Sequence, residues 1–321
     1  MPRIFVNDVG RLRSGWRLLV YFLPLVFFTI VWGILLRLIL QLIAASGLVI
    51  PRSAFVFEVI FRAGLIVLAI GLGYLCARGL EALPWRSLGL TFHRGWFKDL
   101  VVGFGIGFAA LVVAVAIASK GLHFSFNSDG WRAVAVSMIG SAVLLFVGAL
   151  AEEAMFRGYG LQTLSRAKLA WLGVLLTSVP FGLAHLDNPN VIPAVTFTNT
   201  ALAGVWLAAA YLRTRSLWLA QGVHWAWNWA LGWFFGLPVS GLHLVSHPLL
   251  RAEDTGPRWL TGGTYGIEGG VACTIAVILV TLFLWRTSLV SATPELLKMT
   301  SEENPVTSAP VLSIRSVADQ A

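Results

Sequence analysis

Charged side chains are scarce in this sequence. Asp, Glu, Lys and Arg make up 12% of its 321 residues, whereas hydrophobic residues make up 57%. A soluble globular domain carries about 25% charged residues, so the composition argues against a soluble domain and indicates an integral membrane protein. The net charge of +8 comes from Arg and Lys residues that stand mainly between apolar runs. The positive-inside rule explains this placement, and we therefore expect no nucleic-acid partner.

Cysteine is almost absent as well. Cys76 and Cys273 are the two cysteines of the sequence, and both fall in apolar runs, where cysteine behaves as a small hydrophobic residue. Two cysteines cannot build a disulfide framework or a cysteine metal cluster, and their positions argue against a catalytic thiol. The sequence also lacks a serine-elbow motif in a suitable context and a His-Glu-x-x-His zinc motif.

Long apolar runs dominate what is present. A transmembrane helix needs about 20 residues, and such segments are expected near residues 18–40, 56–77, 100–118, 133–150, 171–185, 191–212, 217–237 and 270–285. The expected fold is therefore all-α, a polytopic membrane helix bundle of about eight transmembrane helices. We expect one domain over residues 1–290, with a motif core at 131–235 and a long outer loop at 238–269. A disordered cytoplasmic tail should follow at 291–321, and the basic loops place both termini in the cytoplasm.

The fourth apolar run is interrupted by two carboxylates and an arginine, in Glu152-Glu153-x3-Arg157. An ionised side chain at bilayer depth costs roughly 2.5–3.5 kcal/mol, so such residues usually serve a site. Glu153 and Arg157 are four residues apart and are predicted to form an ion pair on one helix face. Glu152 points about 100° away from that pair, which favours it as the carboxylate that does chemistry. The helix is expected to continue past Arg157 towards Leu164.

Two later runs carry polar groups that could meet Glu152. Phe181 and His185 share a helix face at the end of the fifth run, and His224 and Asn228 share a face in the seventh. Each of these polar groups needs a hydrogen-bonding partner inside the bundle. Their convergence around Glu152 is therefore the expected arrangement.

Two chemistries suit this set, and the residues alone leave both open. In the first, Glu152 is a general base that activates a water molecule together with His185, while His224 and Asn228 donate hydrogen bonds to the tetrahedral oxyanion. In the second, Glu152, His185 and His224 bind zinc and leave one position open for water. Both chemistries lead to hydrolysis of an amide bond.

The three motifs, in this order on successive helices, resemble those of the CPBP family, which groups CAAX-prenyl endoproteases with bacterial Abi bacteriocin-processing and immunity proteins. The resemblance covers roughly residues 131–235. It implies that Glu152 is the catalytic carboxylate acting with His185, that His224 and Asn228 form the oxyanion hole, and that Glu153 and Arg157 support them. It also implies a bacterial cell membrane, a membrane-associated peptide or lipidated protein as substrate, and either no cofactor or zinc.

Other readings remain open. A non-catalytic membrane scaffold or bacteriocin-immunity protein could use the same polar cluster to hold helices together, and a proton-coupled transporter could also carry carboxylates and histidines in its helices. Glu58 and Arg62, four residues apart, are interpreted as a helix-end ion pair. The Gly103-x3-Gly107 spacing favours close helix packing over a phosphate-binding loop.

Overall fold

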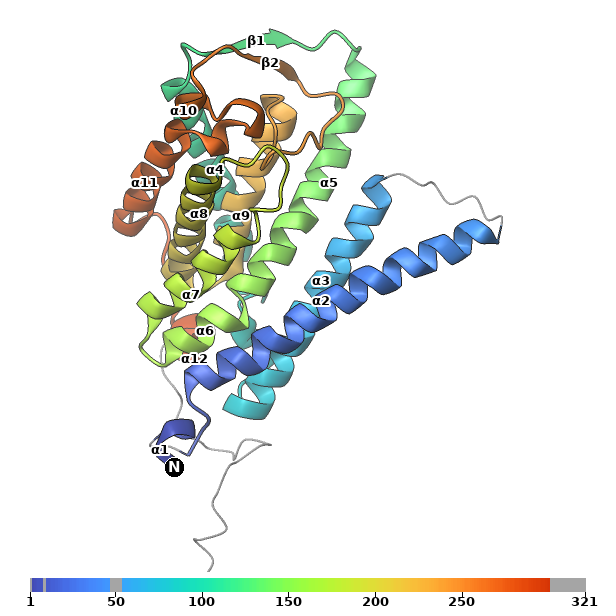
Figure 1. Cartoon of the computed structure of the whole chain (residues 1–321). Coiled ribbons are helices and arrows are strands. Elements are labelled where there is room, and N and C mark those ends of the chain that lie inside the picture. Colours follow the sequence, from blue (N-terminus) through green and yellow to red (C-terminus); the bar gives the residue numbers. More distant parts are fainter. Residues whose placement is uncertain (1, 8–9, 47–53, 301–321) are drawn as a thin grey trace, which may run out of the picture. The chain divides into compact units, whose positions relative to one another are not determined.

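The structure is a computed structural model that describes residues 2–7, 10–46 and 54–300, and it is built almost entirely of helices (Figure 1). The predicted all-α fold is confirmed, because each of the eight expected segments overlaps a helix. Among the described residues, five helices are long and apolar enough to cross a membrane, and two further apolar helices are shorter. The chain is thus a multi-pass membrane protein.

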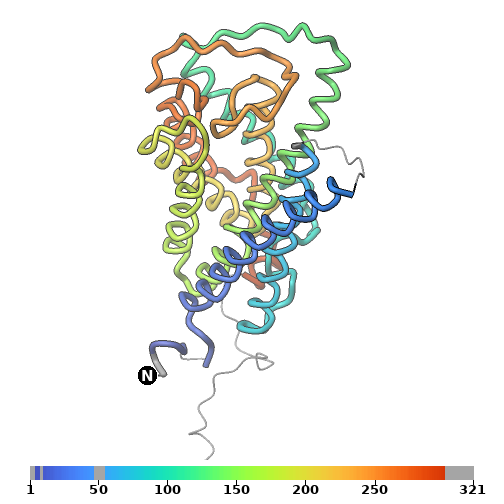
Figure 2. The backbone as a smooth tube through the Cα atoms, turned by 45° about the vertical axis from the view of Figure 1, so that its right-hand side comes forward, coloured from blue at the N-terminus to red at the C-terminus, as the bar shows by residue number. Residues whose placement is uncertain are grey.

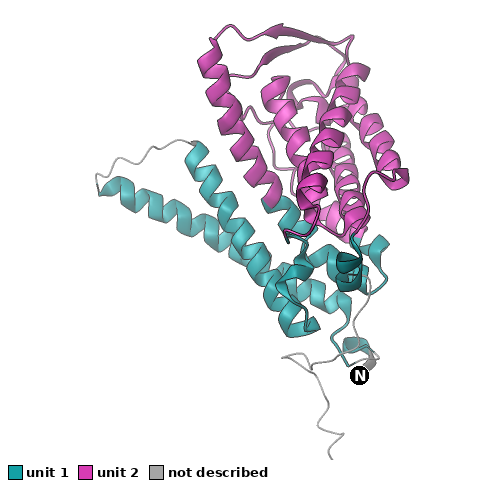
Figure 3. Ribbon diagram, turned by 180° about the vertical axis from the view of Figure 1, so that it is seen from behind, with its two compact units in different colours: residues 1–91, 151–173, 293–321 teal, residues 92–150, 174–292 magenta. Residues whose placement is uncertain are grey.

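The chain divides into two compact units (Figure 3). Unit 1 comprises Met1–Thr91, Ala151–Gly173 and Thr293–Ala321, and unit 2 comprises Phe92–Leu150 and Val174–Ala292. Helices α5 (Trp131–Phe156) and α7 (Ala170–Leu183) each pass from one unit into the other. The expected motif core at 131–235 is therefore divided between the two units.

Unit 1 is organised around two long helices. Its remaining elements are short, and together the elements of this unit are α1 (Pro2–Phe5), α2 (Ser14–Ala45), α3 (Ala54–Glu81), η1 (Trp85–Leu88), α6 (Tyr159–Arg166) and α12 (Pro294–Thr300). Helices α2 and α3 lie side by side (Figure 2), and the Trp32 indole donates a hydrogen bond to the Phe61 carbonyl at 3.0 Å. The core includes Tyr21 and Tyr159, whose rings lie 5.4 Å apart.

A buried ion cluster ties three helices of unit 1 together. Glu81, at the end of α3, accepts hydrogen bonds from Arg166 of α6 at 3.0 and 2.8 Å and from Arg17 of α2 at 2.9 Å. All three side chains are at most 1% exposed. Charged groups at this depth require partners, so the cluster fixes where these three helices meet.

Unit 2 holds the remaining elements: α4 (Trp96–Ile117), β1 (Leu122–Phe126), α8 (Pro193–Thr214), α9 (Leu217–Trp229), the π-helix η2 (Ala230–Phe234), β2 (Leu250–Asp254), α10 (Arg258–Thr261), η3 (Gly263–Tyr265), η4 (Ile267–Gly269) and α11 (Val271–Arg286). Helices α4 and α9 pack with their backbones in contact. A Cβ atom at Gly103 would overlap the Leu219 carbonyl, and one at Gly107 would overlap the Val223 carbonyl. The predicted role of these glycines in close helix packing is confirmed.

The segment at 238–269, predicted to be a loop, contains β2, α10, η3 and η4 instead. Strand β2 pairs with β1 in an antiparallel two-stranded sheet, with Phe124 opposite Ala252. Just before α5, Asp129 accepts hydrogen bonds from His247, at 2.8 Å, and from Arg251. These hydrogen bonds lower the pKa of the Asp129 carboxyl to about 2, and the bond from His247 has the largest effect. Sequence patterning missed the sheet because its strands are 123 residues apart and only five residues long.

The end of α5 differs from the prediction. Helix α5 ends at Phe156 rather than near Leu164, and α6 begins anew at Tyr159. The turn between them closes at Gly158, whose N–H donates to the Glu153 carbonyl at 3.0 Å and where a side chain would overlap the Ala154 carbonyl.

Within the tail predicted to be disordered, residues Pro294–Thr300 instead form the helix α12, which packs on α6 and η1. Residues 301–321 lie outside the described part of the chain.

Candidate active site

The glutamate turn of unit 1 contains the predicted ion pair. Arg157 donates to the Glu153 carboxylate at 3.1 Å, and neither side chain is exposed. Tyr21 of α2 donates to the carbonyls of Ala154 and Met155 at 3.3 and 3.2 Å. The end of α5 is therefore held both by the ion pair and by the neighbouring helix.

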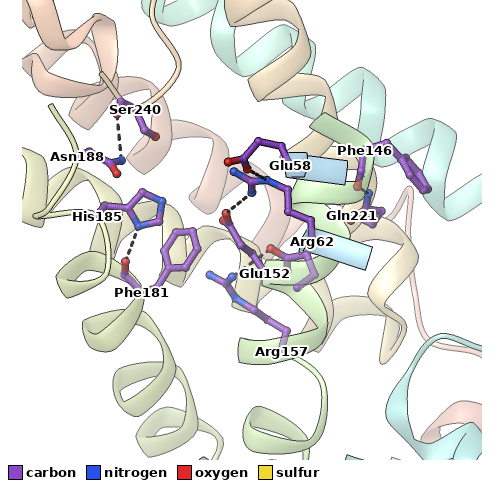
Figure 4. A network of polar contacts seen from close by, with 11 residues as sticks. Glu58, Arg62, Phe146, Glu152, Arg157, Phe181, His185, Asn188, Gln221 and Ser240 are labelled. Atoms are coloured by element: carbon purple, nitrogen blue, oxygen red, sulfur yellow. Dashed lines mark hydrogen bonds and ion pairs between the residues drawn. The ribbon is translucent and has the colours of Figure 1, made fainter. Parts of the chain in front are cut away.

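Glu152 points toward Arg62 of α3, which was predicted to pair with Glu58 alone (Figure 4). Its carboxylate lies 3.6 Å from the Arg62 guanidinium, which also donates to Glu58 at 3.1 Å. The predicted Glu58–Arg62 pair is confirmed, but its interpretation as a helix-end pair alone is incomplete. The four-residue spacing of Glu58 and Arg62 within an apolar run is the sequence signal that marks Arg62.

Arg62 lies close enough to Glu152 for a direct electrostatic attraction. At about 4 Å, opposite charges attract by about 1 kcal/mol in water and by about 4 kcal/mol at an effective dielectric constant of about 20. Both side chains are about one quarter exposed, so the attraction lies between these values. Arg62 thus attracts the Glu152 carboxylate and orients it.

In unit 2, His185 lies in the turn that follows α7 and is half-buried. Its Nδ1 lies 2.7 Å from the Phe181 carbonyl oxygen (Figure 4). A carbonyl can only accept, so Nδ1 carries the hydrogen, and in the neutral ring Nε2 is left as an acceptor. This tautomer suits a nitrogen that takes up a proton or holds a water molecule.

His224 and Asn228 lie one helical turn apart on α9. His224 is buried and meets the Phe181 ring edge-on, with centroids 6.1 Å apart, while the same ring lies 4.7 Å from that of His185. The structure therefore brings the two candidate imidazoles, those of His185 and His224, to one aromatic ring.

Helix α9 is anchored to α5 by two side chains that the sequence analysis did not single out. Gln221 donates to the Phe146 carbonyl at 2.9 Å, and Trp225 donates to the Ala142 carbonyl at 3.0 Å. Gln221 is one turn before His224, and it is fully buried. A polar amide within an apolar run was the available signal for this anchor.

The candidate residues thus form two groups: Glu152, Glu153 and Arg157 in unit 1, and His185, His224 and Asn228 in unit 2. The zinc alternative requires Glu152 together with both imidazoles. Within neither unit do three His, Cys, Asp or Glu side chains of the described residues gather closely enough to hold a metal ion. A zinc site does not fit either group by itself.

A family match covers the motif-bearing segment of the chain. Residues 134–230 match the family described as type II CAAX prenyl endopeptidase Rce1-like, whereas no curated protein matches the chain. The matched segment contains all three motifs, from Glu152 to Asn228, and supports a CAAX-type intramembrane endopeptidase in general terms. Over residues 134–230 the chain is similar to the Rce1-like type II CAAX prenyl endopeptidases, and its predicted resemblance to the CPBP family is confirmed.

Proposed function

We propose that this protein is an intramembrane endopeptidase that hydrolyses a peptide bond of a membrane-associated substrate, such as a prenylated CAAX-type peptide. The observation that carries the proposal is the family match over residues 134–230, which contains every candidate catalytic residue. The resemblance to the CPBP family, and not the geometry alone, supplies the reaction class.

In the proposed reaction, Glu152 accepts a proton from a water molecule as the water oxygen attacks the scissile carbonyl carbon. His185 holds this water through Nε2, the nitrogen left as an acceptor by the bond to Phe181. The carbonyl π-bond breaks, and the resulting oxyanion accepts hydrogen bonds from His224 and Asn228. The oxyanion then re-forms the carbonyl double bond, and the C–N bond breaks as Glu152 returns its proton to the leaving nitrogen, which gives a carboxylic acid and an amine.

Supporting residues hold the reacting carboxylate in place. Arg62 lies against Glu152 at 3.6 Å, and the buried Glu153–Arg157 pair fixes the turn that carries it.

The experiment is cleavage of a fluorescence-quenched prenylated peptide by the purified full chain in lipid nanodiscs, with and without chelator. Glu152→Gln should lower kcat by about 10²–10⁴-fold, the usual contribution of a general base, while Glu295→Gln, which removes an exposed carboxylate of the same unit, should not. Cleavage by the wild type that Glu152→Gln leaves unchanged would refute the assignment. Loss of cleavage with chelator, restored by zinc, would favour Glu152, His185 and His224 as metal ligands.

The same assay separates the enzyme from a non-catalytic scaffold. A scaffold would bind the peptide and yield no product, and Glu152→Gln would then alter thermal stability alone.

Both termini are proposed to be cytoplasmic, and protease protection of tags at each end in inverted membrane vesicles tests this orientation.

A further inference from the structure

Glu268, in the 3₁₀ helix η4, is the acceptor for two distant segments of unit 2. One carboxylate oxygen accepts from the Trp227 indole N–H at 2.9 Å, and the other accepts from the Ser240 N–H at 2.6 Å and the Ser240 hydroxyl at 3.2 Å. Glu268 lies outside the matched residues 134–230, and no candidate motif includes it. Its partners, however, adjoin two of the three motifs.

The first partner fixes α9. Trp227 is adjacent to Asn228 and three residues after His224, and its side chain is buried edge-on against Trp206, with ring centroids 5.7 Å apart. A hydrogen bond from an indole to a carboxylate is charge-assisted and stronger than a neutral one. It therefore resists rotation of the helix that carries His224 and Asn228.

The second partner fixes the turn after His185. The Ser240 carbonyl accepts from the Asn188 side chain at 3.0 Å, and the Asn188 N–H donates to the His185 carbonyl at 3.3 Å (Figure 4). Ser240 has a φ of +48°, a left-handed conformation that is uncommon for residues other than glycine. The two bonds to Glu268 hold Ser240 in that conformation, and thereby present its carbonyl to Asn188.

Glu268 is itself fixed by its backbone. The buried Asn199 of α8 donates to the carbonyls of Glu268 and Gly270 at 2.8 and 2.9 Å, and its own oxygen accepts from Thr274 of α11 at 2.6 Å. The carboxylate is thus a rigid reference point rather than a mobile side chain.

We propose that Glu268 is a positioning residue that sets the spacing between the His185 turn and the His224–Asn228 face of α9. This inference rests on the proposed function, because it assigns those groups to one reaction. Glu268 touches neither water nor substrate in this scheme and acts through Trp227 and Ser240. Small displacements of reacting groups cost about 10²-fold in rate, so the effect should appear in kcat rather than in KM.

The test compares Glu268→Ala and Glu268→Gln with Glu253→Gln, which removes an exposed carboxylate from β2. Glu268→Ala should lower peptide-cleavage kcat by at least 10-fold with KM changed by less than 2-fold. Glu268→Gln, which keeps one acceptor oxygen, should lose less. Adding Asn188→Ala to Glu268→Ala should cause no further loss, because both remove the same link. Equal losses for Gln and Ala, or fully additive losses, would overturn the proposal.

A second measurement does not depend on cleavage. The rate at which diethyl pyrocarbonate modifies His185, followed by mass spectrometry, should rise at least 3-fold in Glu268→Ala and stay unchanged in Glu253→Gln. An unchanged rate in Glu268→Ala refutes the positioning role. If His185 becomes more reactive but even the wild-type protein cleaves no peptide, Glu268 still positions the turn and the proposed hydrolase function fails by itself.

Discussion

Glu81→Ala should lower the free energy of unfolding of this protein by about 3–5 kcal/mol, the usual result of removing one partner from a buried ion pair. The variant leaves two buried guanidinium groups, those of Arg17 and Arg166, without the carboxylate that accepts three of their hydrogen bonds. Solvent cannot replace it, because all three side chains are at most 1% exposed. Glu81→Gln should be nearly as destabilising, because it keeps the shape and removes the charge.

The matched control is Glu295→Ala. Glu295 also pairs with an arginine of unit 1, Arg86, but at 3.6 Å and with both side chains about 60% exposed. Exposed pairs contribute about 0–1 kcal/mol, so this variant should unfold almost like the wild type. Tryptophan fluorescence during denaturation in detergent measures both variants. If Glu81→Ala is no more destabilising than Glu295→Ala, the buried cluster does not hold the three helices together.

Three further predictions concern other parts of the fold. Gly107→Val should force α4 away from α9 and lower the thermal unfolding temperature by several degrees, whereas Gly105→Ala, where a Cβ meets nothing within 4 Å, should not. Arg62→Met should lower peptide-cleavage kcat by up to about 10-fold, equivalent to about 1.4 kcal/mol. Glu58→Gln should lower kcat less. Equal losses for the two variants would contradict a direct action of Arg62 on the catalytic carboxylate. Because the pKa of Asp129 falls from 3.8 to about 2, its stabilising effect should be complete above about pH 4 and disappear as the pH falls to about 2. Circular dichroism of Asp129→Asn across that range should converge with the wild type at the acid end.

Local rules predicted much of this molecule. Hydrophobic run length located the helices, because a membrane span must satisfy its backbone hydrogen bonds internally. Spacing of four residues identified the Glu153–Arg157 and Glu58–Arg62 pairs. The same spacing of Gly103 and Gly107 predicted close helix packing, and the structure shows that the partner is α9. Each of these features depends on residues within one or two helical turns.

Features that depend on distant residues were missed for the same reason. Arg166 reads as a basic boundary residue in sequence, yet it is buried on Glu81, 85 positions earlier. Arg62 reaches Glu152 through tertiary packing, and Glu268 meets Trp227 across 41 positions. The roles of Glu152, His185, His224 and Asn228 in catalysis remain predictions, because placement alone does not report reactivity.

The Arg17–Glu81–Arg166 cluster also implies an order of assembly during biosynthesis. Arg17 and Glu81 lie on the first two long helices, so they can neutralise each other as soon as this hairpin has left the ribosome. Arg166 is synthesised 85 residues after Glu81 and brings a second positive charge to a site that is already neutral. When the first two long helices pack as in the structure, Arg17 and Glu81 therefore offset each other's charge before α6 is synthesised.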